Sequence, residues 1–408
     1  MPKVIPFKAV RPTRDKVSLV ASRSYETYTK KERQARLDVN PYSFLHIVNP
    51  GYKYQKEITG KDRFQLVRNR YEEFKEDHTF IQDAQASFYI YKIVDRDAQC
   101  FCGIIAATSI EDYIKNKIKK HEDTIAWRES LFKEYLDTVG FNAEAVLLTY
   151  PDNDDLANLL ENSMQERPEY EFTTTYKDTH YLWAVHDTTI IKNIQHIFKG
   201  MPSLYIADGH HRSASSALLS GDYKGTSPTD SHHFFMSYLI PESHLKIHEF
   251  NRLVTDLNGL SKEEFLIQLD AHYRIENRGT TAYKPSKKHH FSMYLDGEFY
   301  SLYLRKSHYD FNDALSKLDT QILYTTILKP ILGIDDLRNN DRLSYAHGKK
   351  DLVYLKNCID NKEYSVGFNM LPITIEELKA VADEDLTMPP KSTYIEPKLR
   401  SGITIYEF

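Results

Sequence analysis

The fold is set by one stretch of sequence, Leu204-Tyr205-Ile206-Ala207-Asp208-Gly209-His210-His211-Arg212-Ser213-Ala214-Ser215-Ser216-Ala217-Leu218-Leu219. A short apolar run rich in β-forming residues stops at Asp208-Gly209. Small residues and a leucine pair follow, as is typical of a helix. The pattern predicts a strand, a tight turn and a helix. A helix start leaves backbone N–H groups without intrahelical partners and carries partial positive charge, so an anion can bind there.

Six consecutive residues at this junction supply candidate ligand contacts. They are Asp208, Gly209, His210, His211, Arg212 and Ser213. The helix dipole favours acids in the first turn, so an arginine there indicates a bound anion. Adjacent histidines point about 100° apart on a helix, whereas a helical zinc site needs them four residues apart. We predict a phosphate or nucleotide site at these six residues, with His210 and Arg212 also catalytic and no metal held by the protein alone. A solvated turn is the alternative.

The composition limits the class of protein. The chain has 408 residues, enough for two domains, with 53 basic and 58 acidic residues and a net charge of −5. This balance gives no global basic surface, so we expect no nucleic-acid partner. Three cysteines are too few for a disulfide framework, which indicates a reduced, cytoplasmic setting. No apolar run reaches about 18 residues, so we expect no membrane association.

Helical and strand patterns alternate along the chain and predict a mixed α/β or α+β fold. Strands are expected at 17–21, 44–48, 87–94, 101–108, 145–150, 172–176, 181–185, 204–208, 234–240 and within 289–304. Helices are expected at 29–38, 60–77, 109–120, 127–139, 188–198, 210–221 and 315–328. The pattern changes after Pro241, which predicts a core domain at 1–245 and a second, helix-rich region at 246–408.

Two segments near the N-terminus carry candidate site residues. Glu26 follows a predicted strand end and is the first candidate for a general base, with Arg23 and Tyr25 as substrate contacts. Asn40, Tyr42 and Ser43 are also candidate substrate contacts, although turn chemistry alone explains that segment equally well.

Glu122 and His121 lie between two predicted helices. Glu122 is a candidate acid, base or magnesium ligand, and His121 is a candidate substrate contact. A charged helix end without a ligand is the alternative.

The segment from Met388 to Gly402 is rich in proline and basic residues and has no helical or strand period over most of its length. We expect it to return to the site as an extended strap held by a partner surface or a bound anion. Lys391, Ser392 and Thr393 are the candidate phosphate contacts, and Lys398 and Ser401 are further donors. A strap without a ligand is the alternative.

Five stretches resemble the DUF1015 family of bacterial proteins. In chain order they are Ile5-Pro6-Phe7-Lys8-Ala9-Val10-Arg11-Pro12, Asn40-Pro41-Tyr42-Ser43-Phe44-Leu45-His46, Lys120-His121-Glu122-x-Thr124, Tyr205-Ile206-Ala207-Asp208-Gly209-His210-His211-Arg212 and Met388-Pro389-Pro390-Lys391-Ser392-Thr393-Tyr394. The fourth and fifth are the most specific. The chain departs from the family pattern at Tyr25-Glu26, where Tyr-Asp is expected, and at the apolar Ile125-Ala126-Trp127.

The Asp208–Arg212 turn is similar to the Asp-Gly-His-Thr-Arg turn of free-serine kinases of the ParB/sulfiredoxin superfamily. In those enzymes the turn cradles nucleotide phosphates, and a carboxylate from an earlier segment activates the substrate hydroxyl. The resemblance implies a ParB/sulfiredoxin-like core, a phosphate site at residues 208–213 and Glu26 as the base.

We therefore expect a phosphotransferase acting between ATP, ADP or pyrophosphate and a small hydroxyl acceptor, first of all free L-serine. A magnesium ion held partly by substrate phosphates, with Asp208 or Glu122, would neutralise charge. A nucleotide-binding switch of ParB type and a phosphoester hydrolase are the other interpretations that the sequence allows, and it leaves the oligomeric state open.

Overall fold

The computed structural model describes residues 1–225, 227, 229–347, 350 and 352–408, and these form two compact units. The first unit comprises Met1–Lys120, Thr124–Leu245 and Pro397–Phe408. The second comprises His121–Asp123 and Lys246–Glu396. The last twelve residues therefore belong with the N-terminal part of the chain, which also holds the Asp208–Ser213 stretch.

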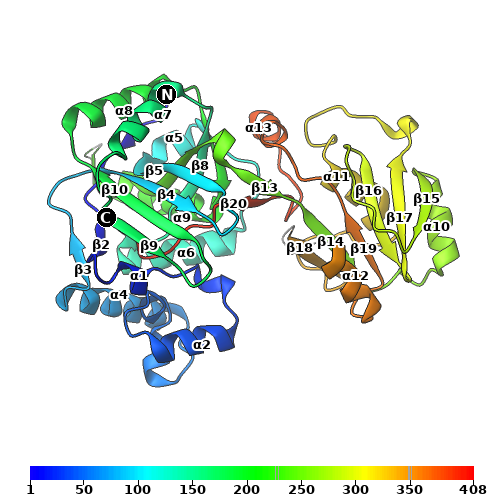
Figure 1. Cartoon of the computed structure of the whole chain (residues 1–408), viewed down its shortest axis with the longest axis horizontal. Coiled ribbons are helices and arrows are strands. Elements are labelled where there is room, and N and C mark those ends of the chain that lie inside the picture. The colour runs from blue at the N-terminus through cyan, green and yellow to red at the C-terminus, as the bar shows by residue number, and fades with distance from the viewer. Residues whose placement is uncertain (226, 228, 348–349, 351) are drawn as a thin grey trace. The chain divides into compact units, whose positions relative to one another are not determined.

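A nine-stranded mixed sheet forms the centre of the first unit (Figure 1). Eight strands lie in the order β6 (Ile118–Lys119), β11 (Leu204–Asp208), β8 (Val146–Tyr150), β12 (Phe234–Pro241), β5 (Cys100–Ser109), β4 (Phe88–Val94), β10 (Thr179–Val185) and β9 (Tyr170–Thr173). The ninth, β1 (Val4–Ile5), pairs with β5. The fold is mixed α/β, as predicted.

The neighbours of β11 position its last residues. β11 runs parallel to β6 and antiparallel to β8, so its end lies between the residues after β6 and the residues before β8. The β11–β8 register shifts between Ile206 and Asp208, and such a bulge redirects the side chain that follows it. The predicted strand, turn and helix are confirmed, with α9 (His210–Asp222) beginning directly after Gly209.

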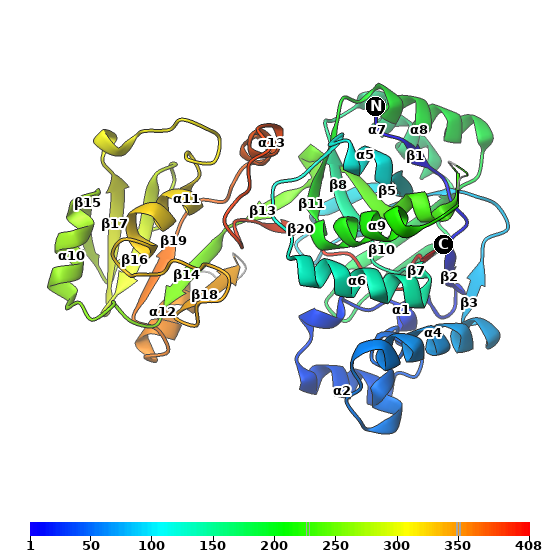
Figure 2. The same ribbon diagram turned by 180° about the vertical axis from the view of Figure 1, so that it is seen from behind.

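Six longer helices belong to the first unit. They are α2 (Lys30–Val39), α4 (Gly60–Glu76), α6 (Ala126–Val139), α7 (Asp154–Ser163), α8 (Thr188–Gly200) and α9. α6 and α9 lie side by side (Figure 2). α8 shows why such helices form, because Asp187 caps its start and its apolar face buries Ile194 and Phe198 in the sheet core.

A smaller core joins the N-terminal segment to the C-terminal one. Val10, Phe44, Val67 and Tyr71 pack together with Ile405, all of them at most 1% exposed. The backbone of Val10 exchanges hydrogen bonds with that of Ile405, and β21 (Tyr406–Glu407) pairs with β7 (Phe141–Asn142). The C-terminal segment is therefore part of the core of this unit.

A six-stranded antiparallel sheet forms the second unit. Its order is β15 (Tyr273–Gly279), β17 (Glu298–Leu304), β16 (His290–Leu295), β19 (Val366–Asn369), β14 (Phe250–Val254) and β18 (Leu343–His347). Its helices are α10 (Lys262–Asp270), α11 (Asp319–Leu323), a π-helical turn (Tyr324–Leu328), α12 (Leu352–Asp360) and α13 (Ile375–Asp383). This unit thus contains a sheet as well as the predicted helices, and the sheet includes the strands expected within 289–304.

Two short strands predicted near the N-terminus are wrong. Residues 17–21 contain the helical turn α1 (Val17–Val20), and residues 44–48 contain α3 (Leu45–Val48). Val17 and Val20 are both buried, which is the spacing of one helical turn. Apolar runs of four or five residues fit a buried strand and a buried helical turn equally well, so packing decides between them.

The long helix predicted at 109–120 is also wrong. α5 (Ile110–Ile114) covers only its start, and Ile118–Lys119 forms β6. Asn116 has a left-handed backbone with φ +54°, and the N–H of Lys117 returns to the carbonyl of Asp112. Asparagine tolerates this conformation, so it ends the helix and the chain turns into the sheet.

Gly103 in β5 tests how closely the central strands are packed. A Cβ added to Gly103 would lie 2.3 Å from the carbonyl oxygen of Leu239. We expect Gly103→Ala to lower the free energy of unfolding by about 3 kcal/mol, because the backbone of a packed strand must shift. Urea denaturation measures this change.

Gly221→Ala is the control for that experiment. Gly221 lies near the end of α9 with nothing within 4 Å of an added Cβ, so the substitution should be neutral or raise the free energy of unfolding by up to ~1 kcal/mol. Equal denaturation midpoints for Gly103→Ala and Gly221→Ala would contradict the expected packing.

Candidate functional site

The turn between β11 and α9 requires glycine. Gly209 has φ +107°, a conformation that L side chains rarely adopt, and it stands at the N-cap of α9. A Cβ there would also lie 3.2 Å from the Cζ and Nε atoms of Arg212. No side chain caps this helix start among the described residues. The partial positive charge of the helix dipole at this start favours an anion.

Asp208 is held by two cations from different parts of the chain. Its Oδ2 accepts a hydrogen bond from Nη2 of Arg212 at 3.0 Å, and its Oδ1 accepts one from Nζ of Lys398 at 3.3 Å. Arg212 also donates to the carbonyl oxygen of Ala145, the residue before β8. Burial acts to raise the pKa of Asp208, but Lys398 and Arg212 outweigh it and lower that pKa. Asp208 is therefore a carboxylate that fixes both cations beside the helix start.

His210 and Ser213 lie inside the first turn of α9. His210 is 5% exposed, and burial lowers its pKa to about 4, so its imidazole is neutral at pH 7. The hydroxyl of Ser213 donates to the carbonyls of Gly209 and His210 at 3.2 and 3.1 Å. His211 is partly buried, and its carbonyl accepts a 2.6 Å hydrogen bond from Ser215. Ser213 thus closes the turn with its own side chain.

The charge around this helix start is positive. Arg212 and Lys398 are about one-third exposed on their side chains, and Lys120, directly after β6, acts electrostatically on His210. Two cations thus contact the carboxylate of Asp208, Lys120 adds positive charge near His210, and the helix dipole adds to them. Such a site can bind a phosphate or another oxyanion.

Glu26 lies on an exposed turn, Tyr25–Thr27, and is itself exposed. Arg33 fixes this turn by donating to the carbonyls of Tyr25 and Tyr28 at 3.4 and 3.0 Å. The preceding Ser22 exchanges two backbone hydrogen bonds with Ser401 of the C-terminal segment. The segment that carries Lys398 is therefore tied to the one that carries Arg23, Tyr25 and Glu26.

The Asn40–Ser43 segment has a local structural explanation. Asn40 donates from its amide to the carbonyl of Leu19 at 2.7 Å and accepts from the N–H of Tyr42 at 3.1 Å. The hydroxyl of Ser43 is buried and accepts from the N–H of Leu45 at 3.3 Å. These contacts account for the polar residues through turn chemistry, the alternative stated above.

The remaining predicted residues belong to the second unit. The backbone of His121 accepts from the N–H of Met388 at 2.9 Å, which places the 121–123 segment beside the start of the proline-rich stretch. His121 is buried and Glu122 partly exposed. In the proline-rich stretch, Ser392 is buried and bonded to Pro389, Lys391 is exposed and lies over the ring of Phe250, and Thr393 is partly buried.

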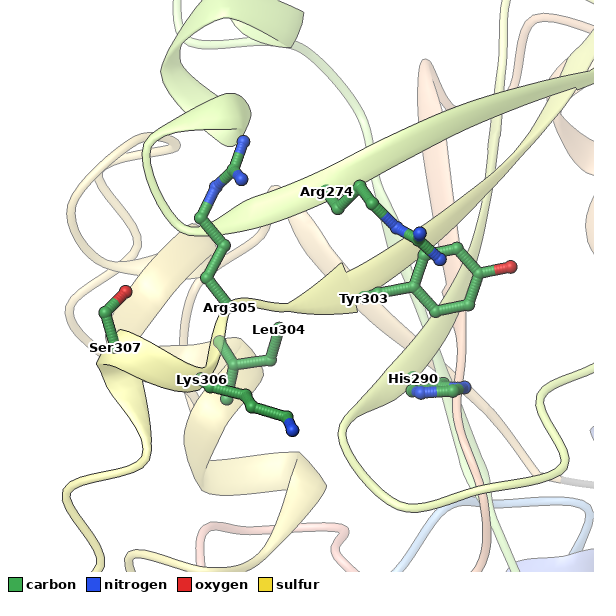
Figure 3. A pocket seen from close by; sticks show the side chains of 7 residues that line it. All are labelled: Arg274, His290, Tyr303, Leu304, Arg305, Lys306 and Ser307. Atoms are coloured by element: carbon green, nitrogen blue, oxygen red, sulfur yellow. The ribbon is translucent and has the colours of Figure 1, made fainter.

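Two surface cavities lie in the second unit. One of about 460 Å³ is basic, with Arg274, His290, Tyr303 and Lys306 among its walls (Figure 3). Its arginines already have carboxylate partners, Arg274 with Glu276 and Arg305 with Asp270. The other, of about 410 Å³, is lined by Asp123 and the 387–390 segment among others. Neither contains a residue of the Asp208–Ser213 turn.

Residues 4–321 match the sequence family described as protein of unknown function DUF1015. The chain belongs to the DUF1015 family. No curated protein matches this DUF1015 chain.

Solved structures with a similar chain course include three of low identity. SbnI with a C-terminal truncation from Staphylococcus aureus is 12% identical over 73% of this chain and 85% of its own, with a TM-score of 0.39. A conserved hypothetical protein from Pyrococcus furiosus is 12% identical over 74% and 94%, with a TM-score of 0.35. A free serine kinase in complex with AMP is 12% identical over 74% and 91%, with a TM-score of 0.36.

Two features of the DUF1015 site could not be found from the sequence motif alone. Lys120 is not among the contacts that the sequence predicts, since only its place after a strand parallel to β11 brings it near His210. The carbonyl of Ala145 cannot be predicted as a contact of Arg212, because every residue has a backbone carbonyl. The sequence predicts Lys398 as a further donor, but it contains nothing that pairs Lys398 with Asp208 in particular.

Magnesium would have to be held mainly by substrate oxygens. No group of three or more potential metal-binding His, Cys, Asp or Glu side chains occurs among the described residues. Magnesium commonly binds through one or two carboxylates together with substrate phosphates and water. Asp208 fits such a role, because each of its oxygens accepts one hydrogen bond and keeps a second lone pair.

Burial of His210 predicts a pH dependence of stability. The folded pKa of about 4 lies below the usual 6.5, so between these values the unfolded chain binds a proton that the folded chain does not. The free energy of unfolding should therefore fall as the pH decreases from 6.5 to 4. NMR titration should show the His210 ring resonances moving only near pH 4.

The His210→Gln variant separates the contribution of His210 to this pH dependence from the contributions of other titrating groups. The variant lacks the titrating ring, so its free energy of unfolding should fall less over the same pH window. His180, whose pKa burial lowers to about 3, contributes equally to both proteins. Titration of His210 near pH 6.5 would show that its ring is solvated, contrary to the structure.

Proposed function

We propose that this DUF1015 protein transfers a phosphoryl group between a nucleotide or pyrophosphate and a small hydroxyl acceptor, with free L-serine as the first candidate. The single observation that carries the proposal is the helix start at Gly209, which no side chain of the described residues caps and beside which Asp208 fixes Arg212 and Lys398. Phosphoryl transfer asks a protein mainly to position its substrates and to neutralise phosphate charge. This arrangement supports both tasks.

In the proposed reaction the donor phosphates bind the α9 N-terminus. Arg212 and Lys398 contact phosphate oxygens, and the neutral His210 supports the turn that presents the backbone N–H groups. The acceptor hydroxyl oxygen attacks the terminal phosphorus, its O–P bond forms, and the bond to the donor oxygen breaks. Magnesium, when bound, neutralises charge on the phosphates.

Glu26 is the proposed base for this step. Its exposed carboxylate can take the proton that the acceptor hydroxyl loses, and the turn that carries it is fixed by Arg33. The nucleotide or phosphate leaves with the electron pair of the broken bond. The roles of Glu122 and of the Lys391–Thr393 segment stay predictions from the sequence.

Phosphorus NMR tests the reaction. Purified protein is mixed with L-serine, magnesium and, in turn, ATP, ADP and pyrophosphate, and we expect a phosphoserine resonance with at least one donor. Phosphoserine with ADP or AMP should give the reverse transfer. Inorganic phosphate without phosphoserine would indicate a hydrolase, and no turnover in either direction would refute the serine kinase proposal.

Replacing Glu26 tests the base. We expect Glu26→Gln to lower kcat by about 10²- to 10⁴-fold with little change in the Kd of the donor, since the amide cannot accept the proton. Glu57→Gln is the matched control, because Glu57 is also an exposed glutamate of the first unit. An unchanged kcat for Glu26→Gln would remove Glu26 from the mechanism.

Lys398→Met tests whether the C-terminal segment belongs to the phosphate site. We expect ADP to bind about 10- to 100-fold more weakly, because a charge-assisted contact to phosphate is lost. Isothermal titration calorimetry measures the Kd, with Lys192→Met on the exposed side of α8 as the control. Equal Kd values for the two variants would exclude Lys398 from the site.

A further inference from the structure

A second cationic cluster lies in the first unit, around the ring of Tyr176. Its arginines come from three separate segments: Arg23 after Ser22, Arg36 in α2 and Arg400 in the C-terminal segment. The guanidinium carbons lie 4.5, 5.3 and 5.5 Å from the ring centroid, respectively. Tyr176 itself occupies the turn between β9 and β10. Because the members are so far apart in sequence, only the fold brings them together.

Arg400 fixes the turn that carries Tyr176. Its side chain is only 5% exposed and donates to Asp178 at 2.9 Å and to Thr174 at 3.4 Å. The N–H of Tyr176 bonds to the hydroxyl of Thr174 at 3.3 Å. Arg400 is thus already paired with a carboxylate and sets the position of the tyrosine.

Arg23 and Arg36 differ from Arg400 in their partner, because they contact the phenol oxygen of Tyr176 and not a carboxylate. Arg36 donates to the phenol oxygen of Tyr176 at 2.9 Å, and Arg23 reaches the same oxygen. Burial acts to raise the pKa of Tyr176, but these two guanidinium groups outweigh it and lower that pKa. Neither arginine forms an ion pair with a carboxylate anywhere in the described part of the chain.

Glu32 is a carboxylate whose pKa responds to both arginines, but it already accepts hydrogen bonds as part of the cap of α2. Glu32 is influenced electrostatically by Arg23 and Arg36, but it accepts from the backbone N–H and the hydroxyl of Thr29 at 2.8 and 2.9 Å as the cap of α2. Each guanidinium carries five N–H donors, so most of those on Arg23 and Arg36 are available to a ligand. Two like charges sharing one phenol oxygen are stabilised by an anion placed between them.

The C-terminal segment connects this cluster to the proposed phosphate site. Lys398 contacts Asp208, and Arg400, two residues later, contacts Asp178. A fully extended chain advances about 3.3 Å per residue, so the backbones of these two residues are at most about 7 Å apart. One short stretch thus contributes a contact to each site, as expected if a single small molecule places its anionic group at the cluster and its reacting hydroxyl nearer α9.

We propose that Arg23 and Arg36 bind the carboxylate of the acceptor, so that the acceptor class is a small hydroxy acid or hydroxy amino acid. This inference rests on the proposed phosphoryl transfer for the identity of the ligand. Arginine suits the role because its planar fork matches the two oxygens of a carboxylate. Glu26, three residues after Arg23, then lies on the segment that also binds the acceptor.

Calorimetric titration without any phosphoryl donor tests this site. The probes are L-serine and L-serinamide, which differ only in carboxylate against amide. We expect the wild-type protein to prefer L-serine by about 10- to 100-fold, and Arg36→Gln to lose that preference. Arg36→Lys should retain part of it. Lys31→Gln, which removes an exposed charge from the same helix, should bind like the wild type.

The outcomes separate this inference from the proposed function. Phosphoserine formation by an Arg36→Gln variant with unchanged KM for L-serine would overturn the carboxylate site while leaving the kinase proposal intact. A carboxylate preference that depends on Arg36, without turnover in the phosphorus NMR assay, would refute the kinase proposal and retain the site. Equal binding of L-serine and L-serinamide by the wild-type protein would overturn the inference directly.

Discussion

The carboxylate of Asp208, held between Arg212 and Lys398, is the interaction on which the candidate site depends. It joins the end of β11, the first turn of α9 and the C-terminal segment at one point. Gly209 makes this geometry possible, since its positive φ and missing Cβ leave room for the guanidinium of Arg212. Because Asp208 carries only one charge against two, the site stays positive at a helix start that already favours anions.

The C-terminal segment gives this arrangement its stability. Ile405 is buried in the small core with Val10 and Phe44, and β21 pairs with β7, so the segment is fixed by apolar packing and backbone hydrogen bonds on its far side. The polar residues nearer its start, Lys398, Arg400 and Ser401, are then presented to Asp208, Asp178 and Ser22. One extended stretch thus positions both the proposed phosphate contacts and the cluster around Tyr176.

No helix among the described residues is long and apolar enough to cross a bilayer.

The local sequence pattern predicts a helix or strand reliably where that element is long or has recognisable capping residues. The capping box of Thr29 and Glu32 opens α2 as predicted, and the spacing of Phe64, Val67, Tyr71 and Phe74 marks the buried face of α4. Short apolar runs were unreliable, because four residues do not distinguish a helical turn from a strand. At 109–120 a single left-handed asparagine ended a helix that composition alone would have continued.

The sequence by itself determined the strand, turn and helix at 204–219, because Asp-Gly punctuation and residue propensity act over a few neighbouring residues. It also predicted a negative partner for the arginine in the first helical turn, and the bound anion inferred from that arginine stays a prediction. Only the tertiary structure decided that this partner is Asp208 shared with Lys398, that Lys120 approaches from β6, and that Arg23, Arg36 and Arg400 meet at Tyr176. Such contacts join residues up to 224 positions apart, as between Tyr176 and Arg400, and they depend on strand order and register, which local sequence does not encode.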